Sequence, residues 1–400
     1  MSAKIRVLQV IKTLNISGAE RFAIDLAINL DPARYAVEVC AFFQDGSPIE
    51  EHWFQELTRR GIPVWYATGW RGLDHFGSYL DGLKVMQRRL RSAPVDVINT
   101  HFQLGTLAAL YCRARGLACR VVRTAQNHCR KEWSPGLYGW LRYLLISGWV
   151  YPLACDAEVG VSRAIVAELR RNPGARFARN EPRLITNAIP VDLVERAQAY
   201  PRPMRQEGQF VVGSIGRLMP QKNYVALLQA VPQVRAELPG VEFWLIGDGE
   251  LRSSLEAQAC DLKITDWVKF LGRQSDVLPW LRQMDLFVLP SLWEGFPLVI
   301  MESMAAGVPV IATDIEGTRD LVQPGHNGWL VPPGDPPALA RQIIAALREL
   351  PTRAKIAAQA LASLAPVSID RVAAQYDRLY GELLLASHSP KARRNEIRIS

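Results

Sequence analysis

Short apolar runs alternate along the chain with longer segments in which apolar residues recur every three or four positions. The short runs have the length and β-branched composition of buried strands, and the longer segments have the periodicity of amphipathic helices. This alternation predicts an α/β fold with doubly wound parallel sheets. In the first half we expect strands at 5–11, 36–43, 63–66, 95–99, 120–125, 158–161 and 184–186. Helices are expected at 19–30, 49–60, 79–91, 106–115 and 162–171.

A second series of strands and helices follows a stretch rich in Pro, Gly and charge at 200–208. Its expected strands are 210–215, 242–246, 268–271, 286–289, 309–312 and 328–331. Two such series predict two Rossmann-like domains with a cleft between them, and chemistry should lie in loops beyond the carboxyl ends of the strands. We expect domains at 1–195 and 209–368, a linker at 196–208, a helix at 369–386 that packs back on the first domain, and a disordered tail at 387–400.

The net charge of +8 is confined to the first half of the chain. Residues 1–200 hold 26 Lys and Arg against 18 Asp and Glu, so residues 201–400 hold 47 − 26 = 21 and 39 − 18 = 21. A basic half indicates an anionic partner: nucleic acid, a lipid surface or a phosphorylated small molecule. The sequence has no paired CxxC and no RNP-like aromatic string, so we expect no nucleic acid.

Composition and segment lengths bear on where the protein works. With 49% hydrophobic and 22% charged residues, the chain is an ordinary globular protein. The six cysteines form no CxxC motif and are expected to be reduced thiols. The first apolar run carries three cations, which argues against a signal peptide, and the longest uncharged stretch, 143–155, falls short of the ~20 residues of a membrane span. We expect a cytoplasmic protein, soluble or peripheral on the inner face of the membrane.

The densest cluster of candidate functional residues follows the strand expected at 286–289. Glu294 precedes a helix expected to begin at Pro297, and Glu302 lies within that helix. At ~1.5 Å rise per residue, Glu302 is about 8 Å along the axis from Pro297, so both carboxylates could reach one ligand. Carboxylates suit vicinal hydroxyls, and the helix N-terminus suits a phosphate. From spacing alone, a capping Glu294 and a solvated Glu302 are an equal alternative.

Three other loops after expected strands carry candidate residues. Arg217 and Lys222 follow the strand at 210–215, where two cations suit a diphosphate, although solvated basic residues are the alternative. Gly18 lies where the first helix opens and would let the backbone approach a phosphate or sugar, unless it only makes a tight turn. His128 follows the strand at 120–125, although a lone His is more often structural.

Motifs of several other enzyme classes are absent from the sequence. There is no GxxxxGK[ST], no HExxH and no GxSxG. No DxD appears either, so a metal-held diphosphate has no candidate ligands. We therefore expect no metal and no cofactor, with the charge of a leaving diphosphate balanced by Arg, Lys and helix N-termini.

Taken together, these segments resemble the retaining glycosyltransferases of family 4, which have the GT-B fold. The resemblance runs from Val7 to about Asp335 and rests on the order of the SGAE loop, the GRL-x3-K segment, and Glu294 and Glu302 followed by SMAAGVPVIAT. It implies transfer of a sugar from a nucleotide-diphosphate sugar to a glycan or lipid-linked acceptor. The expected context is cell-surface polysaccharide or lipopolysaccharide biosynthesis, with the donor on the second domain and the acceptor on the first.

The resemblance also implies a role for each matched residue. Glu294 would bind hydroxyls of the transferred sugar, and Glu302 would bind the ribose hydroxyls. Arg217 and Lys222 would neutralise the diphosphate. His128 would face the transferred sugar and form the catalytic pair with Glu294.

The remaining donor contacts are implied in the same way. Amides near Gly295, Phe296 and Leu298 would complete the phosphate site. Arg273 would lie near the base, and Gly18 beneath the diphosphate. The family retains the anomeric configuration by front-face attack, in which the departing phosphate helps to deprotonate the acceptor.

Three positions depart from the family pattern. Ser17 stands in place of the first glycine of a pair, an alanine follows Asn187 in place of a glycine, and Glu316 precedes Gly317 in place of another glycine. Each leaves a small residue nearby, so donor binding is expected to survive while sugar and acceptor contacts differ. Two other functions stay open: a nucleotide-sugar 2-epimerase of the same architecture, and a catalytically silent subunit. The Glu294 and Glu302 spacing favours transfer, and retention of His128 with the cations favours an active enzyme.

The basic first half also suggests an anionic membrane surface as a partner. One expected helix is crowded by four cations: Lys84, Arg88, Arg89 and Arg91. Four aromatic residues flank the short apolar run that follows: Trp140, Tyr143, Trp149 and Tyr151. Cations beside amphipathic aromatics are typical of proteins that lie on a leaflet. The alternative is a buried helix beside a solvated basic face.

Overall fold

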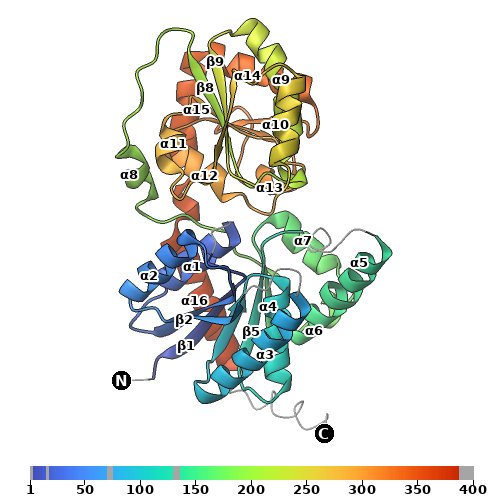
Figure 1. Cartoon of the computed structure of the whole chain (residues 1–400). Helices are drawn as coiled ribbons and strands as arrows, with labels where there is room; N and C mark the ends of the chain where they lie inside the picture. Colours follow the sequence, from blue (N-terminus) through green and yellow to red (C-terminus); the bar gives the residue numbers. More distant parts are fainter. Residues whose placement is uncertain (1–2, 15–17, 70–74, 129–135, 387–400) are drawn as a thin grey trace. The chain divides into compact units, whose positions relative to one another are not determined.

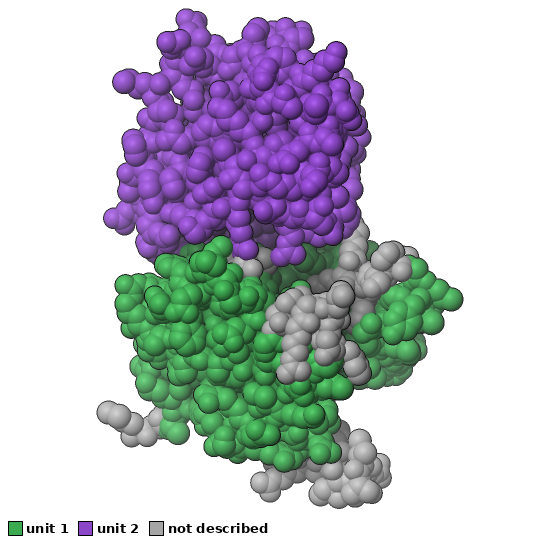
Figure 2. Space-filling model, viewed as in Figure 1, with its two compact units in different colours: residues 1–188, 369–400 green, residues 189–368 purple. Residues whose placement is uncertain are grey.

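The computed structural model describes residues 3–14, 18–69, 75–128 and 136–386, and it divides the chain into two compact units (Figure 1, Figure 2). Unit 1 comprises Met1–Ala188 and Ile369–Ser400, and unit 2 comprises Ile189–Ser368. The tail expected at 387–400 lies outside the described residues.

Unit 1 is built around a seven-stranded parallel sheet in the order β3-β2-β1-β4-β5-β6-β7. The strands are β1 (Ile5–Ile11), β2 (Tyr35–Gln44), β3 (Val64–Gly69), β4 (Val97–Thr100), β5 (Arg120–Ala125), β6 (Ala157–Gly160) and β7 (Arg183–Leu184). The helices are α1 (Gly18–Asn29), α2 (Pro48–Arg59), α3 (His75–Ser92), α4 (Gln103–Ala114), α5 (Leu137–Arg142), η1 (Tyr143–Val150), α6 (Tyr151–Ala154), α7 (Arg163–Arg171), η2 (Ala175–Phe177) and α16 (Ile369–Leu385).

Unit 2 repeats the architecture with six parallel strands in the order β10-β9-β8-β11-β12-β13. They are β8 (Phe210–Ile215), β9 (Val241–Ile246), β10 (Val268–Gly272), β11 (Leu286–Leu289), β12 (Val310–Thr313) and β13 (Trp329–Val331). The helices are α8 (Leu193–Gln198), η3 (Pro220–Lys222), α9 (Tyr224–Glu237), α10 (Arg252–Asp261), α11 (Leu278–Arg282), α12 (Leu298–Ala305), α13 (Glu316–Arg319), α14 (Pro336–Arg348), α15 (Leu350–Ala362) and η4 (Ala365–Val367). Every expected strand of both halves overlaps an observed one, which confirms the α/β class.

The strand order of each sheet locates its binding edge. In unit 1 the order reverses between the neighbours β1 and β4, which pair in parallel with Val7 opposite Val97. In unit 2 it reverses between β8 and β11, with Leu286 opposite Val212. Parallel α/β sheets bind ligands beyond the carboxyl ends of the strands at such reversals. The loops after β8 and β11 are therefore the first place to look for a site in unit 2.

The C-terminal helix α16 is part of the core of unit 1. Tyr376 and Tyr380 are fully buried against apolar residues of the sheet that include Val97. The Tyr376 hydroxyl lies 3.0 Å from Oγ1 of Thr124, and Gln9 Nε2 donates to the Tyr380 hydroxyl at 3.4 Å. Residues at the two ends of the chain thus stabilise one sheet.

The stretch expected as a linker, 196–208, is instead held on unit 2. The Tyr200 hydroxyl donates to Asp276 at 3.0 Å, Arg282 Nε donates to the Tyr200 carbonyl at 3.0 Å, and Arg205 pairs with Asp285 at 3.1 Å. Residues 189–195, expected in the first domain, also belong to unit 2, because α8 packs on α11 and α12. The Pro, Gly and charged residues of this stretch predicted that it is irregular, but they did not predict its contacts with unit 2.

Candidate functional site

The loops after β8 and β11 are joined by hydrogen bonds at the point of strand reversal. The Leu292 amide donates to the Gln221 carbonyl at 2.8 Å, and Gln221 Nε2 donates to the Trp293 carbonyl at 2.8 Å. Adjacent parallel strands bring their carboxyl-end loops together, so this contact follows from the sheet order. It places Lys222 beside Glu294.

The Glu294 carboxylate is nearly buried and is held by three donors. Oε1 accepts from Lys222 Nζ at 2.7 Å and from Ser291 Oγ at 2.6 Å, while Gln221 Nε2 lies 3.4 Å from Oε2. The side chains of Lys222 and Glu294 are 15% and 7% exposed, so the ion pair is weakly screened by water. A carboxylate oxygen accepts more than one hydrogen bond, and Oε2 therefore retains capacity for a hydroxyl donor.

A second layer of contacts supports this loop from β12 and α13. Thr313 Oγ1 donates to the Ser291 carbonyl at 2.5 Å, and Thr318 Oγ1 donates to the Thr313 carbonyl at 2.5 Å. A Cβ added to Gly317 would lie 2.3 Å from the Glu294 carbonyl oxygen, well inside van der Waals contact. Of the two glycines in the family pattern, this chain keeps Gly317, which is the position where a side chain would collide with the backbone of the Glu294 loop.

The predicted phosphate-facing residues meet where the Glu294 loop enters α12. The helix begins at Leu298 with Pro297 at the N-cap, one residue later than expected. Gly295, Phe296 and Leu298 are buried, as is Glu294. Glu302 is half-buried in the second turn, about 6 Å along the axis from the first helical residue.

The two predicted arginines lie on different loops of unit 2. Arg217 follows β8, on the loop that carries Lys222, and Arg273 follows β10. Both guanidinium groups are exposed, and neither pairs with a carboxylate within the described residues. The β8 loop also approaches its neighbour closely, since a Cβ on Gly247 would lie 2.0 Å from the Gly216 carbonyl oxygen. Arg217 therefore lies on the loop next to the Glu294 loop, whereas Arg273 lies on the loop of the edge strand β10, with β9 and β8 between.

In unit 1, His128 follows β5 and pairs with a residue that the sequence did not single out. His128 Nδ1 lies 2.9 Å from Oε2 of Glu168, and their side chains are 16% and 18% exposed. Glu168 is carried by α7, whose N-cap is Ser162 as expected, with Oγ accepting from the Ile165 amide at 3.3 Å. The carboxylate fixes the orientation of the ring through Nδ1.

The other predicted positions of unit 1 lie near the same edge of the sheet. Gly18 is exposed and is the first residue of α1, and its neighbour Ser17 lies outside the described residues. Asn187 is buried, and its Nδ2 donates to Gln126 Oε1 at 2.9 Å. This bond ties the end of the β7 segment to the loop between β5 and His128.

Sequence reasoning missed Gln221, Ser291 and Glu168. Gln221 lies within the GRL-x3-K segment, and Ser291 lies three residues before Glu294. The sequence gives their positions but does not show that their side chains bond to the Glu294 carboxylate. Glu168 lies forty residues beyond His128 in the chain, and only the pairing of β5 with β6 brings the helix that carries it alongside. Within the described ranges, no three His, Cys, Asp or Glu side chains gather closely enough to hold a metal ion.

Comparison with protein families assigns each half of the chain. The family described as Glycosyltransferase Family 4 matches residues 16–193, and Glycosyl transferases group 1 matches residues 209–349. A lipopolysaccharide core biosynthesis glycosyltransferase of Rhizobium meliloti is 43% identical over 133 residues, 33% of this chain and 38% of that protein. An Escherichia coli UDP-Gal:alpha-D-GlcNAc-diphosphoundecaprenol alpha-1,3-galactosyltransferase is 28% identical over 261 residues, 62% of this chain and 65% of that enzyme. The chain spans less than two thirds of either relative.

Solved structures share the architecture over nearly the whole chain. HepE of Anabaena, in complex with UDP and glucose, superposes with a TM-score of 0.76 at 22% identity and covers 94% of this chain and 100% of its own. Sucrose-phosphate synthase of Thermosynechococcus elongatus gives 0.78 at 18% identity, over 96% and 100%. Both likenesses concern the fold. With two parallel-sheet units, the Lys222–Glu294 pair at a strand reversal, and a family match to each half, the chain belongs to the family 4, group 1 glycosyltransferases of GT-B architecture.

Proposed function

We propose that this protein is a retaining, metal-independent glycosyltransferase of cell-surface polysaccharide or lipopolysaccharide biosynthesis. It moves a sugar from a nucleotide-diphosphate sugar to a glycan or lipid-linked acceptor. The observation that carries the proposal is the buried Lys222–Glu294 pair at the carboxyl ends of β8 and β11, on the loops that the family motifs match. The names of the bacterial relatives support the polysaccharide context.

The donor binds to unit 2 in this proposal. Hydroxyls of the transferred sugar donate to Oε2 of Glu294, whose other oxygen is held by Ser291 and Lys222. The ribose hydroxyls donate to Glu302. The diphosphate meets Lys222, Arg217 and the amides at Gly295 to Leu298, where the N-terminus of α12 favours negative charge. Arg273 contacts the base.

Transfer needs charge balance at the leaving group. The bond between the anomeric carbon and the diphosphate oxygen breaks, and the acceptor oxygen bonds to the same face of that carbon. The acceptor proton passes to the departing phosphate oxygen. Lys222, Arg217 and the α12 amides stabilise the developing charge, which is the role that a metal ion plays in other transferases. Activity is therefore expected to persist in EDTA, and a strict need for Mg²⁺ or Mn²⁺ would contradict this account.

His128 contributes the second catalytic group. Its Nδ1 is engaged by Glu168, so Nε2 is the nitrogen that meets the transferred sugar. Gly18 lies at the start of α1, where the absence of a side chain permits close approach of the diphosphate.

A nucleotide-sugar 2-epimerase is not favoured by these findings, because the relatives named above are glycosyltransferases. A direct assay separates the two reactions. Incubation with nucleotide-sugar and no acceptor should leave the sugar unchanged, and formation of an epimer would overturn transfer.

The test of the site compares three variants of unit 2. Glu294→Gln and Lys222→Ala should each lower transfer at least ~10²-fold with the fold intact, because each acts on charge or orientation at the reacting centre. Lys269→Ala is the control, since Lys269 makes a pair of the same length, 2.7 Å to Glu242, at a half-exposed edge of the sheet. Near-normal turnover in both site variants would remove the assignment.

A thermal-shift panel of UDP-, GDP- and ADP-sugars identifies the base, because a ligand raises apparent stability by mass action.

The membrane partner is part of the same proposal. The enzyme works at the cytoplasmic face of an anionic membrane, where lipid-linked acceptors are found.

A further inference from the structure

A stripe of aliphatic side chains runs along the outer face of α5, η1 and α6 in unit 1. Its members are Leu137, Leu141, Leu145, Val150 and Leu153, which are 73%, 42%, 60%, 39% and 43% exposed. Their spacing of three to five residues follows the turns of the continuous helical segment that Figure 1 shows beside α7. Residues 136–154 contain no Asp or Glu. The face is therefore apolar and free of negative charge along its whole length.

The opposite face of this segment is firmly attached to unit 1. The Tyr151 hydroxyl donates to the Gln103 carbonyl at 2.9 Å, and the guanidinium of Arg123 lies 4.5 Å from the centre of the Tyr151 ring. Asn172 Nδ2 donates to the Ser147 carbonyl at 3.0 Å, and the Gly174 amide donates to the Gly148 carbonyl at 2.8 Å. The outer stripe is exposed on an anchored element.

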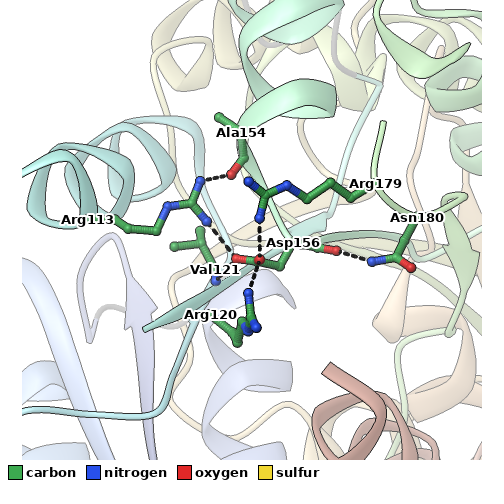
Figure 3. A network of polar contacts seen from close by, with 7 residues as sticks. All are labelled: Arg113, Arg120, Val121, Ala154, Asp156, Arg179 and Asn180. Carbon is green, nitrogen blue, oxygen red and sulfur yellow. Dashed lines mark hydrogen bonds and ion pairs between the residues drawn. The ribbon is translucent and has the colours of Figure 1, made fainter. Parts of the chain in front are cut away.

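The short helix η2 extends the apolar surface. Phe177 is 58% exposed and stacks on Trp149 with ring centroids 6.2 Å apart. The residues that follow are fixed by Asp156, on which the guanidinium groups of Arg113, Arg120 and Arg179 converge in Figure 3. Asn180 Nδ2 donates to the Asp156 carbonyl at 2.7 Å. Phe177 is thus held at the surface from both sides.

Cations lie on α7, the helix that contacts η2. A groove of about 490 Å³ on α7 is lined by Arg163, Arg170 and Arg171 together with apolar residues that include Val166 and Leu184. Residues 163–179 contain five arginines and one carboxylate, Glu168, which is engaged by His128. Outside this range, Asp156 pairs with Arg179 at 3.4 Å and Glu181 lies 3.6 Å from Arg170. Aliphatic and aromatic side chains rimmed by arginines complement a surface that is apolar within and anionic at its boundary.

We propose that the surface formed by α5, η1, α6, η2 and the outer face of α7 docks unit 1 on an anionic lipid membrane. Leucines of the stripe and Phe177 enter the boundary of the acyl chains, and the α7 arginines meet lipid phosphates. The inference deepens the proposed membrane partnership. Its test reads binding rather than turnover, so its failure would leave the transfer assignment standing.

This surface shares the segment 140–151 with the one that the sequence suggested, but its cations lie on α7 instead of α3. Tyr151 is fully buried and belongs to the core of unit 1. On α3, Arg89 lies over the Trp65 ring at 5.4 Å and pairs with Glu38 at 3.6 Å. No helix among the described residues combines the length and apolarity needed to cross a bilayer.

Co-sedimentation of the full-length protein with vesicles tests the surface. Binding should require phosphatidylglycerol in a phosphatidylcholine background and fall with added salt, because screening shortens the reach of surface charge to about 8 Å at physiological ionic strength. Leu145→Glu should lower the bound fraction at least about tenfold, since it places a charge in the apolar boundary. Leu350→Glu is its matched control, because Leu350 is 61% exposed on α15 of unit 2.

A second pair of variants tests the cations. Arg170→Glu with Arg171→Glu should abolish the preference for anionic vesicles, whereas Lys84→Glu with Arg88→Glu on α3 should not. Inorganic phosphate should compete weakly if lipid phosphates are the ligands, and full competition would assign the groove to a free phosphate instead. Equal binding to neutral vesicles, or none to either kind, would overturn the proposal. Self-association in sedimentation velocity that Leu145→Glu removes would assign the stripe to a second copy of the chain.

Discussion

At the scale of single residues, the pair of His128 and Glu168 gives a test of positioning. The two atoms are 2.9 Å apart, and the carboxylate is supplied by α7 rather than by the His128 loop. Glu168→Ala should lower kcat at least about tenfold with little change in KM for the donor, because loss of ring orientation costs rate more than binding. Glu168→Gln retains an acceptor for Nδ1 and should restore part of kcat. Glu181→Ala, at an exposed carboxylate of the same unit, is the control. An unchanged kcat in Glu168→Ala would show that His128 needs no partner.

A second residue, His101, makes the stability of unit 1 depend on pH. His101 is buried, with Nε2 2.9 Å from Gln9 Oε1, and burial lowers the pKa of its imidazole to about 3. The unfolded chain protonates this ring near pH 6.5, before the folded chain does. Its contribution is therefore full above pH ~6.5 and is lost as the pH falls toward 3, by about 1.4 kcal/mol per pH unit. The free energy of unfolding can be measured with denaturant at several pH values between 4 and 8. It should depend less steeply on pH for His101→Gln than for the natural chain. Identical slopes would place the pH dependence elsewhere.

At the scale of elements, the sequence predicted what depends on local pattern. Strands such as β1, β5, β8 and β11 have the expected bounds, because each is a buried apolar run bounded by polar or turn residues. The segment α5, η1 and α6 was expected as an apolar run flanked by aromatics, with a buried helix as the alternative. Its helix bounds were not predicted, because its leucines face outward and give no amphipathic signal of burial. The Lys222–Glu294 contact follows from adjacent loops of a parallel sheet. The contact between Glu168 and His128 does not follow from adjacent loops, because the approach of Glu168 to His128 depends on the register of β5 and β6.

The contact between α13 and the Glu294 loop yields a prediction for a whole element. Gly317→Ala would place a Cβ 2.3 Å from the Glu294 carbonyl oxygen and 2.9 Å from that of Gly295, so the two backbones must separate. Transfer should fall at least about tenfold, because a shift of about 1 Å at a reacting group can cost 10²-fold. Gly69→Ala meets no atom within 4 Å and should leave activity unchanged. Full activity in Gly317→Ala would mean that the loop position does not limit the rate.

At the scale of the whole molecule, the proposed functions divide between the units. Arg217, Lys222, Arg273 and Glu294 all belong to unit 2, and His128 and the surface proposed to bind lipid belong to unit 1. The excess positive charge of the first half accompanies the unit that carries the proposed lipid surface. A nucleoside diphosphate alone should therefore be recognised by unit 2 without the groups of unit 1.

Hydrogen exchange of the full chain with UDP tests this division. Amides of 216–223 and 291–300 should become protected, because the ligand would engage the cations and the α12 amides while the loops stay joined by the Leu292 bond to Gln221. The α2 helix, which belongs to unit 1, is the internal reference. Lys222→Ala should lose the protection at UDP concentrations that saturate the natural chain, since Lys222 would be the cation nearest the diphosphate. Protection confined to 101–106 and 126–128, the carboxyl-end loops of unit 1, would place the nucleotide on the other sheet and reverse the assignment of donor and acceptor units.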